Sequence, residues 1–436
     1  MTHEFDAIVV GAGPAGAASA ILLARAGWSV ALIEKQRFPR RKVCGECIAA
    51  SNLPLLEALG IGEAFLALAG PELHQVALMR ANSTVIADLP PADHPTLRWG
   101  RALGRETLDT LLLDQARACG AHILQPWSAH SIEGRPGDWR CAVRSRTTGA
   151  RRILTAGVAI AANGSWEGLP AECLRRSRPR LGADLLAFKA TYHDASLAEG
   201  LLPILSFDGG YGGIVDGDGG MTTLACCIRR DRLQVARDAA RGLRAGDVVE
   251  TLLLRECGGV RLALRNARRI GPWLAAGPLA PGIRLGNDDA PFRVGNAAGE
   301  AHPIIGEGIS MALQSAWLLC SALLEAQGPT QVPDGAAQRL LAMSYSSQWR
   351  HHFEPRLHLA AAFAHLAMRP AGAVPLVALA RAWPGLLTLG ARWGGKTRCA
   401  LDDDAIRALA VRSARDTATP ATTAARQRTA EPEDIA

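Results

Sequence analysis

The stretch that decides the fold is residues 5–34, FDAIVVGAGPAGAASAILLARAGWSVALIE. Residues 5–10 form an apolar run, a glycine turn follows, and residues 17–26 carry the alanines and leucines of a helix. Residues 28–33 form a second apolar run. Two apolar strands on either side of one helix are typical of a parallel sheet that is buried on both faces. The stretch therefore predicts a β-α-β unit.

The glycine turn has the G-x-G-x-x-G spacing of a dinucleotide-binding fold. Gly11 permits the tight turn, Gly13 lets the backbone approach a pyrophosphate, and Gly16 allows close helix packing. The pyrophosphate would lie at the helix N-terminus, where free N–H groups favour an anion. Glu34 follows Gly16 by 18 residues and is placed to accept hydrogen bonds from the ribose of adenosine. The predicted nucleotide contacts in this unit are Gly11, Gly13, Pro14, Ala15, Gly16, Glu34 and Lys35.

The composition narrows the partners and the compartment. The 436 residues carry a net charge of +7 without a basic block, so we expect no nucleic-acid partner, while contact with an anionic membrane surface or an acidic carrier protein stays open. The ten cysteines include only one C-x-x-C pair, Cys44 with Cys47. Because a second pair is missing, we expect no metal site. Dispersed cysteines are typical of a reducing compartment. Charged residues precede the first apolar run, and no segment has about 18 uninterrupted apolar residues. We therefore expect a cytoplasmic protein.

A second glycine-rich turn, GNAAGEAHPIIGEGIS, occupies residues 295–310. The pattern is β-like and glycine-rich over residues 181–228, and long helical stretches follow residue 309. This order predicts an α/β protein in which a substrate domain is inserted into a discontinuous nucleotide-binding domain. The predicted boundaries are 1–70, 100–170 and 270–330 for the nucleotide-binding domain, 71–99 and 171–269 for the substrate domain, 331–412 for a C-terminal helical region and 413–436 for a disordered tail.

The second turn resembles the G-D-A-A-G…P…G-x-G segment of the FAD-dependent hydroxylase and geranylgeranyl reductase superfamily. In that family the acid binds the ribityl chain of FAD. Asn296 stands in its place, and its amide can still hydrogen-bond a hydroxyl. The resemblance implies that the backbone N–H groups of Gly306, Gly308 and Ile309 face the flavin. It also implies a Rossmann-like FAD-binding domain of the GR2 type, an inserted and mainly antiparallel sheet, and C-terminal helices.

Two further motifs match the same family. Residues 104–112, GRETLDTLL, are similar to its R-x-x-L-D-x-x-L helix start, in which Arg105 would reach the pyrophosphate or ribityl region. Residues 42–46, KVCGE, resemble a loop that runs beside the flavin, which adds Cys44 and Gly45 to the implied contacts. A disulfide relay through Cys44 and Cys47 is the sharper alternative to a loop that only packs on the cofactor.

Other positions depart from the family pattern. Asn163 stands where class A hydroxylases carry an Asp used for FAD and NAD(P)H. In residues 209–215, GGYGGIV, Tyr211 matches the Tyr of the reductases' Y-x-W-x-F-P, whereas Gly213 replaces the Trp and should enlarge or reshape the substrate cavity. Within the superfamily the details look most like bacterial flavoproteins associated with type III polyketide synthases. That resemblance implies oxidation of a phenolic or resorcinol-like lipid.

The first functional hypothesis is an FAD-dependent monooxygenase that takes electrons from NAD(P)H and hydroxylates an aromatic polyketide or lipid-like metabolite. His302, as a base or hydrogen-bond donor, and Tyr211, as the partner of a substrate oxygen, are the catalytic candidates. Either could instead be a packing residue with its hydrogen bonds satisfied, and Glu300 and Glu307 could cap the following helix.

Three alternatives remain from the sequence. The first is a reductase or dehydrogenase of an isoprenoid or acyl chain. A halogenase is disfavoured because no two of the ten tryptophans stand one residue apart, as the W-x-W-x-I-P signature requires. The last alternative is a flavin-binding protein without catalytic activity. The expected substrate is small and hydrophobic or aromatic, and the choice between NADH and NADPH and the oligomeric state stay open.

Overall fold

The computed structural model describes residues 3–165, 181–326, 328, 331–396 and 399. Its first sheet has seven strands in the order β7-β2-β1-β10-β9-β8, with β18 also paired to β10. Strands β7, β2, β1, β10 and β18 are parallel, and β8 and β9 complete the sheet as antiparallel strands. The bounds are β1 (Phe5–Val10), β2 (Val30–Ile33), β7 (His122–Leu124), β8 (Trp127–Arg135), β9 (Asp138–Ser145), β10 (Arg151–Ala161) and β18 (Phe292–Arg293).

Helices cover one face of the parallel part of this sheet. Strands β8 and β9, at one edge, fold back over the other face. Side chains of β8 and β9 enclose Ile8, Val10 and their neighbours, whereas α1, α4 and α9 form the large core on the opposite face. Because both faces are covered, β1 and β2 are apolar throughout their paired length. The bounds on the helical side are α1 (Pro14–Arg25), α2 (Leu53–Ala58), α3 (Gly62–Leu68), α4 (Arg105–Ala118) and α9 (Gly308–Ala326).

The second sheet has eight strands in the order β15-β11-β14-β13-β12-β4-β5, with β16 also paired to β11. All its pairs are antiparallel except β12 with β4. The bounds are β4 (Gln75–Arg80), β5 (Ser83–Asp88), β11 (Leu185–His193), β12 (Leu201–Phe207), β13 (Gly210–Asp216), β14 (Thr222–Arg229), β15 (Arg268–Arg269) and β16 (Leu274–Ala276). Two short pairs are β3 (Cys47–Ile48) with β6 (Arg101–Ala102), and β17 (Gly282–Ile283) with β19 (Gly299–Glu300).

The second sheet also lies between two sets of helices. One face packs on α6 (Arg230–Ala239), α7 (Ala245–Glu256) and α8 (Gly258–Ala263). The other faces α11 (Pro370–Ala382) and α12 (Gly385–Trp393). Helices α6 and α7 are separate, because Gly242 takes a positive φ of 88° between them.

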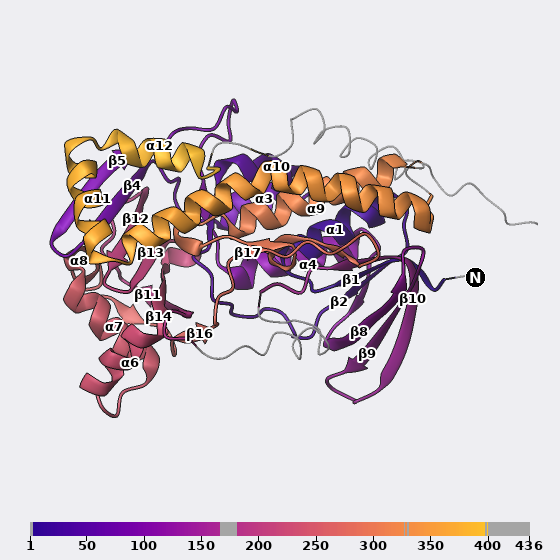
Figure 1. The fold of residues 1–436 in the computed structure, drawn as a ribbon, viewed down its shortest axis with the longest axis horizontal. Helices are drawn as coiled ribbons and strands as arrows, with labels where there is room; N and C mark the ends of the chain where they lie inside the picture. Colours follow the sequence, from indigo (N-terminus) through magenta and orange to yellow (C-terminus); the bar gives the residue numbers. More distant parts are fainter. Residues whose placement is uncertain (1–2, 166–180, 327, 329–330, 397–398, 400–436) are drawn as a thin grey trace, which may run out of the picture.

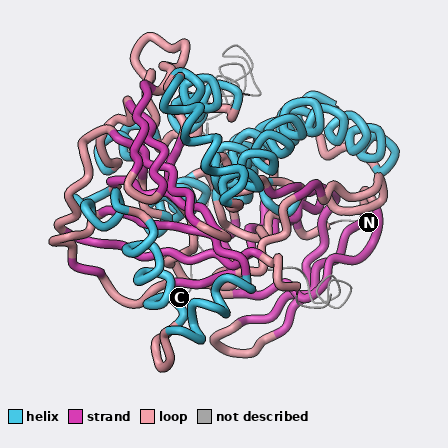
Figure 2. The backbone as a smooth tube through the Cα atoms, turned by 60° about the vertical axis from the view of Figure 1, so that its left-hand side comes forward, coloured by secondary structure: helices cyan, strands magenta, loops and turns pink. Residues whose placement is uncertain are grey.

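The long helix α10 (Gly335–Ala367) connects the two halves of the molecule (Figure 1). Its 33 residues span about 50 Å at 1.5 Å per residue. In Figure 2 the long helices lie along the upper side of the molecule, and the strands occupy two regions below and beside them. The fold class expected from the sequence is confirmed, while the predicted tail, residues 413–436, lies outside the described residues.

Among the described helices, α9 is long and apolar enough by itself to cross a bilayer, but 78% of its apolar window is buried inside the protein. Helices α10 and α11 meet the same criterion only as a pair bent by 103°. The composition of α9 is explained by its packing between α1 and α10, since a helix enclosed on all sides is apolar all round.

Candidate functional site

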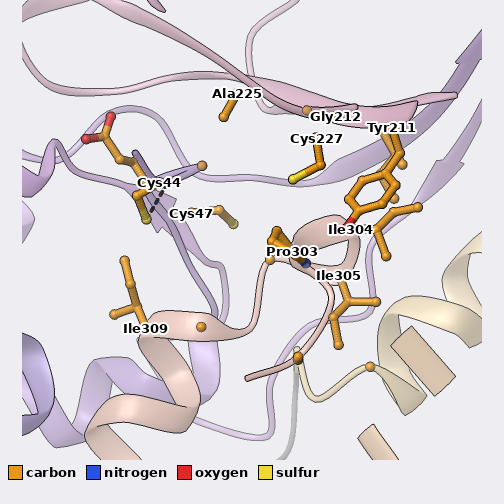
Figure 3. Close-up of a pocket in the computed structure, with 18 of the residues that line it drawn as sticks. Cys44, Cys47, Tyr211, Gly212, Ala225, Cys227, Pro303, Ile304, Ile305 and Ile309 are labelled. Atoms are coloured by element: carbon orange, nitrogen blue, oxygen red, sulfur yellow. Dashed lines mark hydrogen bonds between the residues drawn. The ribbon is translucent and has the colours of Figure 1, made fainter. Parts of the chain in front are cut away.

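A cavity of about 430 Å³ lies between the two sheets and beneath the C-terminal helices. Its more polar end is formed by the first glycine turn, the Cys44–Cys47 loop and the N-terminus of α9. Its apolar end is formed by β12 and β13 and by α10, α11 and α12. Figure 3 shows the region between them, with Cys44 and Ile309 on one side and Tyr211 and Ile304 on the other. The cavity therefore joins the two predicted domains.

The three glycines of the first turn have different physical roles. Gly11 has φ +104°, and a Cβ there would lie 2.5 Å from the carbonyl oxygen of Ala162. A Cβ on Gly16 would lie 1.8 Å from the carbonyl oxygen of Gly11, so the turn itself requires both glycines. A Cβ on Gly13 would meet only the guanidinium ends of two arginines, 3.6 and 4.0 Å away. This open space on the cavity wall fits a pyrophosphate at the N-terminus of α1.

Two arginines flank this open space. Arg105 donates through Nε and Nη2 to both carboxylate oxygens of Asp109, at 2.7 and 2.8 Å. Arg40 Nη2 lies 3.4 Å from Asp109 Oδ2 and 3.9 Å from Glu34 Oε2. Glu34 Oε2 also accepts from the backbone N of Ala12 at 3.0 Å. The carboxylates hold the guanidinium groups beside the glycine turn, where they can pair with phosphate oxygens.

Glu46 ties the cysteine loop to both halves of the protein. It takes a left-handed φ of 60° and is 5% exposed. Its carboxylate accepts from the backbone N of Arg105 at 2.7 Å, from Thr223 Oγ1 at 2.7 Å, and from Lys189 Nζ. Thr223 lies on β14 and Lys189 on β11, so the loop is anchored to the second sheet as well as to α4. A buried carboxylate with three donors holds the loop in one position.

The thiols of this loop line the cavity. Cys44 and Cys47 are both free, and Cys44 Sγ accepts from the backbone N of Glu46 at 3.3 Å (Figure 3). Burial raises the pKa of the Cys47 thiol above its usual range, and the nearby Lys396 lowers it only in part. Both cysteines therefore lie as thiols where the cofactor loop was expected, and a disulfide relay between them stays a prediction.

The N-terminus of α9 forms the adjacent wall. Gly306 has φ +65°, and a Cβ on Gly308 would meet no atom within 4 Å. Both glycines and Ile309 line the cavity. The first N–H groups of a helix lack intrahelical partners and carry partial positive charge. The wall therefore fits the carbonyl-bearing edge of a flavin that gains negative charge on reduction.

A buried charge cluster lies behind this wall. Glu307 is fully buried, with Lys396 Nζ 3.5 Å from Oε1 and Arg356 Nη1 3.8 Å from Oε2. Burial raises the pKa of Glu307, and Lys396 and Arg356 oppose that shift. Lys396 Nζ also donates to the carbonyl oxygen of Gly306 at 3.4 Å and contacts Cys47 Sγ at 3.7 Å. Glu307 was expected as a possible helix cap, but the contacts of its carboxylate are ion pairs with Lys396 and Arg356.

A polar chain connects Asn296 to the interior. Asn296 Nδ2 donates to Ser165 Oγ at 2.8 Å, and Ser165 Oγ donates to Glu300 Oε1 at 2.8 Å. Arg284 Nη2 contacts Glu300 Oε2 at 3.4 Å and the carbonyl oxygen of Asn296 at 2.5 Å. Glu300 therefore orients Ser165 and Arg284. The amide of Asn296 is held on the cavity wall, where it can meet a ribityl hydroxyl.

The two catalytic candidates are in direct contact. The hydroxyl of Tyr211 lies 3.1 Å from His302 Nδ1, and the ring of His365 packs edge-on against His302 at 5.5 Å between centroids. Burial, with a further contribution from His365, lowers the pKa of His302 to about 4. Burial also raises the pKa of Tyr211 well above its usual value. At neutral pH the pair is therefore a neutral phenol hydrogen-bonded to a neutral imidazole.

The apolar end of the cavity contains the second departure from the family pattern. A Cβ on Gly213 would meet only the carbonyl oxygen of Pro203, at 3.3 Å. The missing indole therefore leaves open space on the wall formed by β12 and β13. The facing wall carries apolar side chains of the C-terminal helices, namely Leu359, Phe363, Leu376, Leu386, Leu387 and Leu389.

Most of the residues predicted from the sequence meet at this cavity. Those that line it are Gly13, Pro14, Ala15, Cys44, Gly45, Arg105, Tyr211, Asn296, Gly306, Gly308 and Ile309. Gly11 and Gly16 shape the turn behind the wall, Glu34 and Lys35 lie beyond the lining, and His302 lies behind Tyr211. Sequence reasoning missed Arg40, which immediately precedes the 42–46 motif. It also missed Lys189 and Lys396, which reach the site from distant segments without a local motif.

The comparisons with known proteins agree with this geometry. Residues 4–176 match the family model of an FAD binding domain. A menaquinone reductase of Mycobacterium tuberculosis strain H37Rv is 37% identical over 120 residues, which cover 27% of this chain and 28% of the reductase. The match thus spans less than a third of that relative. The chain carries an FAD-binding domain, and the expected cofactor is confirmed.

Solved structures extend the likeness to the whole fold. The chondrochloren halogenase CndH from a myxobacterium has a TM-score of 0.69 at 15% identity, covering 94% of this chain and 96% of that one. PqsL of Pseudomonas aeruginosa, described as a probable FAD-dependent monooxygenase, has a TM-score of 0.63 at 17% identity, covering 85% and 98%. The resemblance inferred from the sequence motifs is confirmed, at the level of a shared FAD-binding fold.

Proposed function

We propose that this FAD-binding protein is a monooxygenase that hydroxylates a lipophilic aromatic compound, such as a phenolic polyketide lipid. The observation that carries the proposal is the single cavity with two unlike ends. One end has the glycines, arginines and helix N-terminus that suit FAD, and the other is lined by leucines and has open space at Gly213. An aromatic ring with an apolar chain fits such a shape, because apolar surface leaves water on binding.

The residues at the junction of the two ends suit a phenolic substrate. The Tyr211 hydroxyl can donate to Nδ1 of neutral His302, 3.1 Å away, while its oxygen accepts a hydrogen bond from a phenol O–H. Because the pKa of His302 is about 4 and that of Tyr211 is raised, the pair would act through hydrogen bonding and not by removing the phenol proton. Such a hydrogen bond leaves more electron density on the phenol oxygen and its ring, which favours attack on an electrophilic oxygen.

Bound FAD would supply the redox chemistry by carrying two electrons from NAD(P)H to molecular oxygen. The balanced reaction is ArH + O₂ + NAD(P)H + H⁺ giving ArOH + H₂O + NAD(P)⁺. The part of this chain is to hold the cofactor at Gly13, Arg105 and Asn296, to position the ring near Tyr211, and to exclude water with the leucines of the C-terminal helices.

The second candidate is a flavin-dependent reductase, in which oxygen is not a substrate. It is favoured by the 37% identity to menaquinone reductase over 120 residues and by the two thiols on the cavity wall. The hydroxylase is preferred because the Tyr211–His302 pair offers a hydrogen bond to a phenol at the junction of the two ends of the cavity.

The test is reduction of the purified FAD-loaded protein by NADPH or NADH, followed by mixing with ¹⁸O₂ in the presence and absence of an alkylresorcinol. Substrate-dependent consumption of the nicotinamide with one ¹⁸O atom in the product supports the proposal. Anaerobic turnover to a product without added oxygen would establish the reductase instead.

Tyrosine variants test the role of the Tyr211 hydroxyl. Tyr211→Phe should lower the hydroxylation rate by about 10²-fold or more while FAD binding is retained. Tyr192→Phe is the matched control, because Tyr192 is also buried and donates to Glu250 at 2.8 Å, but it does not line the cavity. Equal rates for the two variants would remove Tyr211 from the mechanism.

A further inference from the structure

Helix α11 has apolar side chains on both of its faces. Its inner face packs Val377 and Ala380 against the second sheet. Its outer face consists of Val374, Pro375, Ala378, Leu379 and Ala382, all of them exposed to solvent. The side chain of Val374 is 61% exposed and that of Leu379 is 53% exposed. A helix that is apolar all round is normally enclosed by protein or lipid. The outer face of α11 is instead exposed to solvent.

Tryptophans extend this face onto α12. Trp383 precedes α12 and is 53% exposed, and Trp393 ends it and is 61% exposed. The outer apolar face is defined here as Val374, Leu379, Trp383 and Trp393. In Figure 1 α11 and α12 lie together at one end of the molecule, over β4 and β5. Tryptophan side chains combine an apolar ring with one N–H donor and concentrate at membrane–water interfaces.

The charged side chains of α11 and α12 themselves are all positive. Residues 355–401 contain no Asp or Glu. The exposed cations are Arg369, Arg381 and Arg392, at the two ends of α11 and in the last turn of α12. The adjoining strand β5 adds one exposed carboxylate, Asp88, which accepts from Gln75 at 3.2 Å. Apolar side chains rimmed by arginines match an anionic lipid surface, since basic groups near such a surface are attracted to it.

The same helices close the cavity. Trp393 lines the cavity and is also mostly exposed, so it stands at the mouth. Leu376, Leu386 and Leu389 continue the lining inward from the mouth. The outer side of α11 and α12 thus faces solvent while their inner side faces the apolar end of the site.

We propose that α11 and α12 dock on the surface of an anionic lipid bilayer, with the outer apolar face in the interfacial layer and the cavity mouth at Trp393 open toward the lipid. The arginines would contact lipid phosphates, and a lipophilic substrate would pass from the bilayer into the cavity without crossing water. The docking concerns the surface of α11 and α12 and holds for either candidate reaction.

The test is flotation of the FAD-loaded protein with vesicles. Vesicles of phosphatidylcholine containing about a third phosphatidylglycerol should carry the protein, and pure phosphatidylcholine should carry much less. The double variant Val374→Glu/Leu379→Glu should reduce the bound fraction by about tenfold or more. The matched control is Val235→Glu, because Val235 is 59% exposed and lies on α6, away from α11 and α12. Far-UV circular dichroism and FAD content should be unchanged in both.

Lipids with brominated acyl chains locate the contact, because they quench the fluorescence of tryptophans that enter the bilayer. Quenching should occur in the wild type and be largely lost in Trp383→Phe/Trp393→Phe. Three results would overturn the proposal: flotation independent of lipid charge and of the Glu substitutions, binding lost equally in the α6 control, or a dimer that the Glu substitutions dissociate while no vesicle binding is seen. The last would assign the surface to a second copy of the chain. The ¹⁸O₂ experiment uses detergent-solubilised substrate, so its outcome is independent of docking.

Discussion

Lys189 and Glu46, 143 residues apart in the sequence, form a buried ion pair that joins the cysteine loop to β11. Both side chains are 5% exposed. The pair connects the edge of the cofactor site to the sheet that forms the substrate end of the cavity. The loop carrying Cys44 and Cys47 is therefore positioned by the second domain as well as by the first.

Breaking this pair should destabilise the protein. Lys189→Met leaves the Glu46 carboxylate buried without its cation, which should lower the free energy of unfolding by about 3 kcal/mol. The double variant Lys189→Met/Glu46→Gln should recover part of that loss, because no buried charge remains unpaired. Urea unfolding of these two variants and of the single variant Glu46→Gln measures the coupling. Additive losses in the double variant would show that the two residues act independently.

Gly13 and Gly16 should respond differently to substitution. Gly13→Val should leave the apoprotein folded, because the protein atoms nearest to the added Cβ are the movable ends of two arginines. It should nevertheless abolish FAD binding, measured by flavin absorbance per protein chain. Gly16→Ala should destabilise the apoprotein itself, because its Cβ would lie 1.8 Å from the Gly11 carbonyl oxygen. Retention of FAD in Gly13→Val would contradict the assignment of this site.

His302 should make the fold sensitive to mild acid. Burial lowers its pKa from about 6.5 to about 4, so between these pH values the unfolded chain binds a proton that the folded protein does not. Its contribution is fully present above about pH 6.5 and is lost as the pH falls toward 4, by up to about 3 kcal/mol. Unfolding free energies at pH 7 and 4.5 should therefore differ less in His302→Gln than in the wild type. His358→Gln, on the exposed side of α10, should behave as the wild type.

Gly213→Trp should fill the apolar end of the cavity. The added ring restores the side chain that the related reductases carry at this position, and it would occupy space in a cavity of about 430 Å³. We expect turnover of an alkylresorcinol to fall at least about tenfold through a higher KM, while FAD content is unchanged. Gly213→Ala should have a small effect, because its Cβ approaches only the Pro203 carbonyl oxygen. Unchanged KM in Gly213→Trp would place the substrate elsewhere.

Lys396 should raise the reduction potential of the bound flavin. Two cations, Lys396 and Arg356, face one carboxylate, Glu307, next to the N-terminus of α9, so the cluster has an excess of positive charge. Positive charge favours the reduced, more negative cofactor. Lys396→Met should lower the midpoint potential by tens of millivolts, about 30 mV for each 1.4 kcal/mol in a two-electron couple. Lys396→Arg should preserve it. Dye equilibration gives both values, and equal potentials in the two variants would exclude an electrostatic role.

The sequence reveals the cofactor end of the site more completely than the rest. Gly11, Gly13 and Gly16 occur in register with two strands and a helix, so local pattern and chemistry coincide. The second turn adds Asn296 and Gly308 through family resemblance, and both line the cavity. Local spacing along the chain is sufficient to recognise such motifs, because one turn of backbone determines the contacts that they make.

The remaining contacts depend on tertiary structure. Lys189 and Lys396 are isolated lysines in unremarkable stretches, and they meet Glu46 and Glu307 only because the sheets and α12 bring them together. His302, a catalytic candidate from the sequence, lies behind Tyr211, a position set by how β13 packs on the loop before α9. No periodicity along the chain encodes such pairings.

Because the cavity wall near Cys47 includes Lys396, that wall can be completed only late in translation. Ser51 Oγ donates to the carbonyl oxygen of Gly395 at 3.2 Å, and Lys396 contacts Cys47, which the ribosome adds 349 residues earlier. Because the chain is synthesised from its N-terminus, the glycine turn is made long before α10, α11 and α12. The wall near Cys47 is therefore complete only after residue 396 has been added.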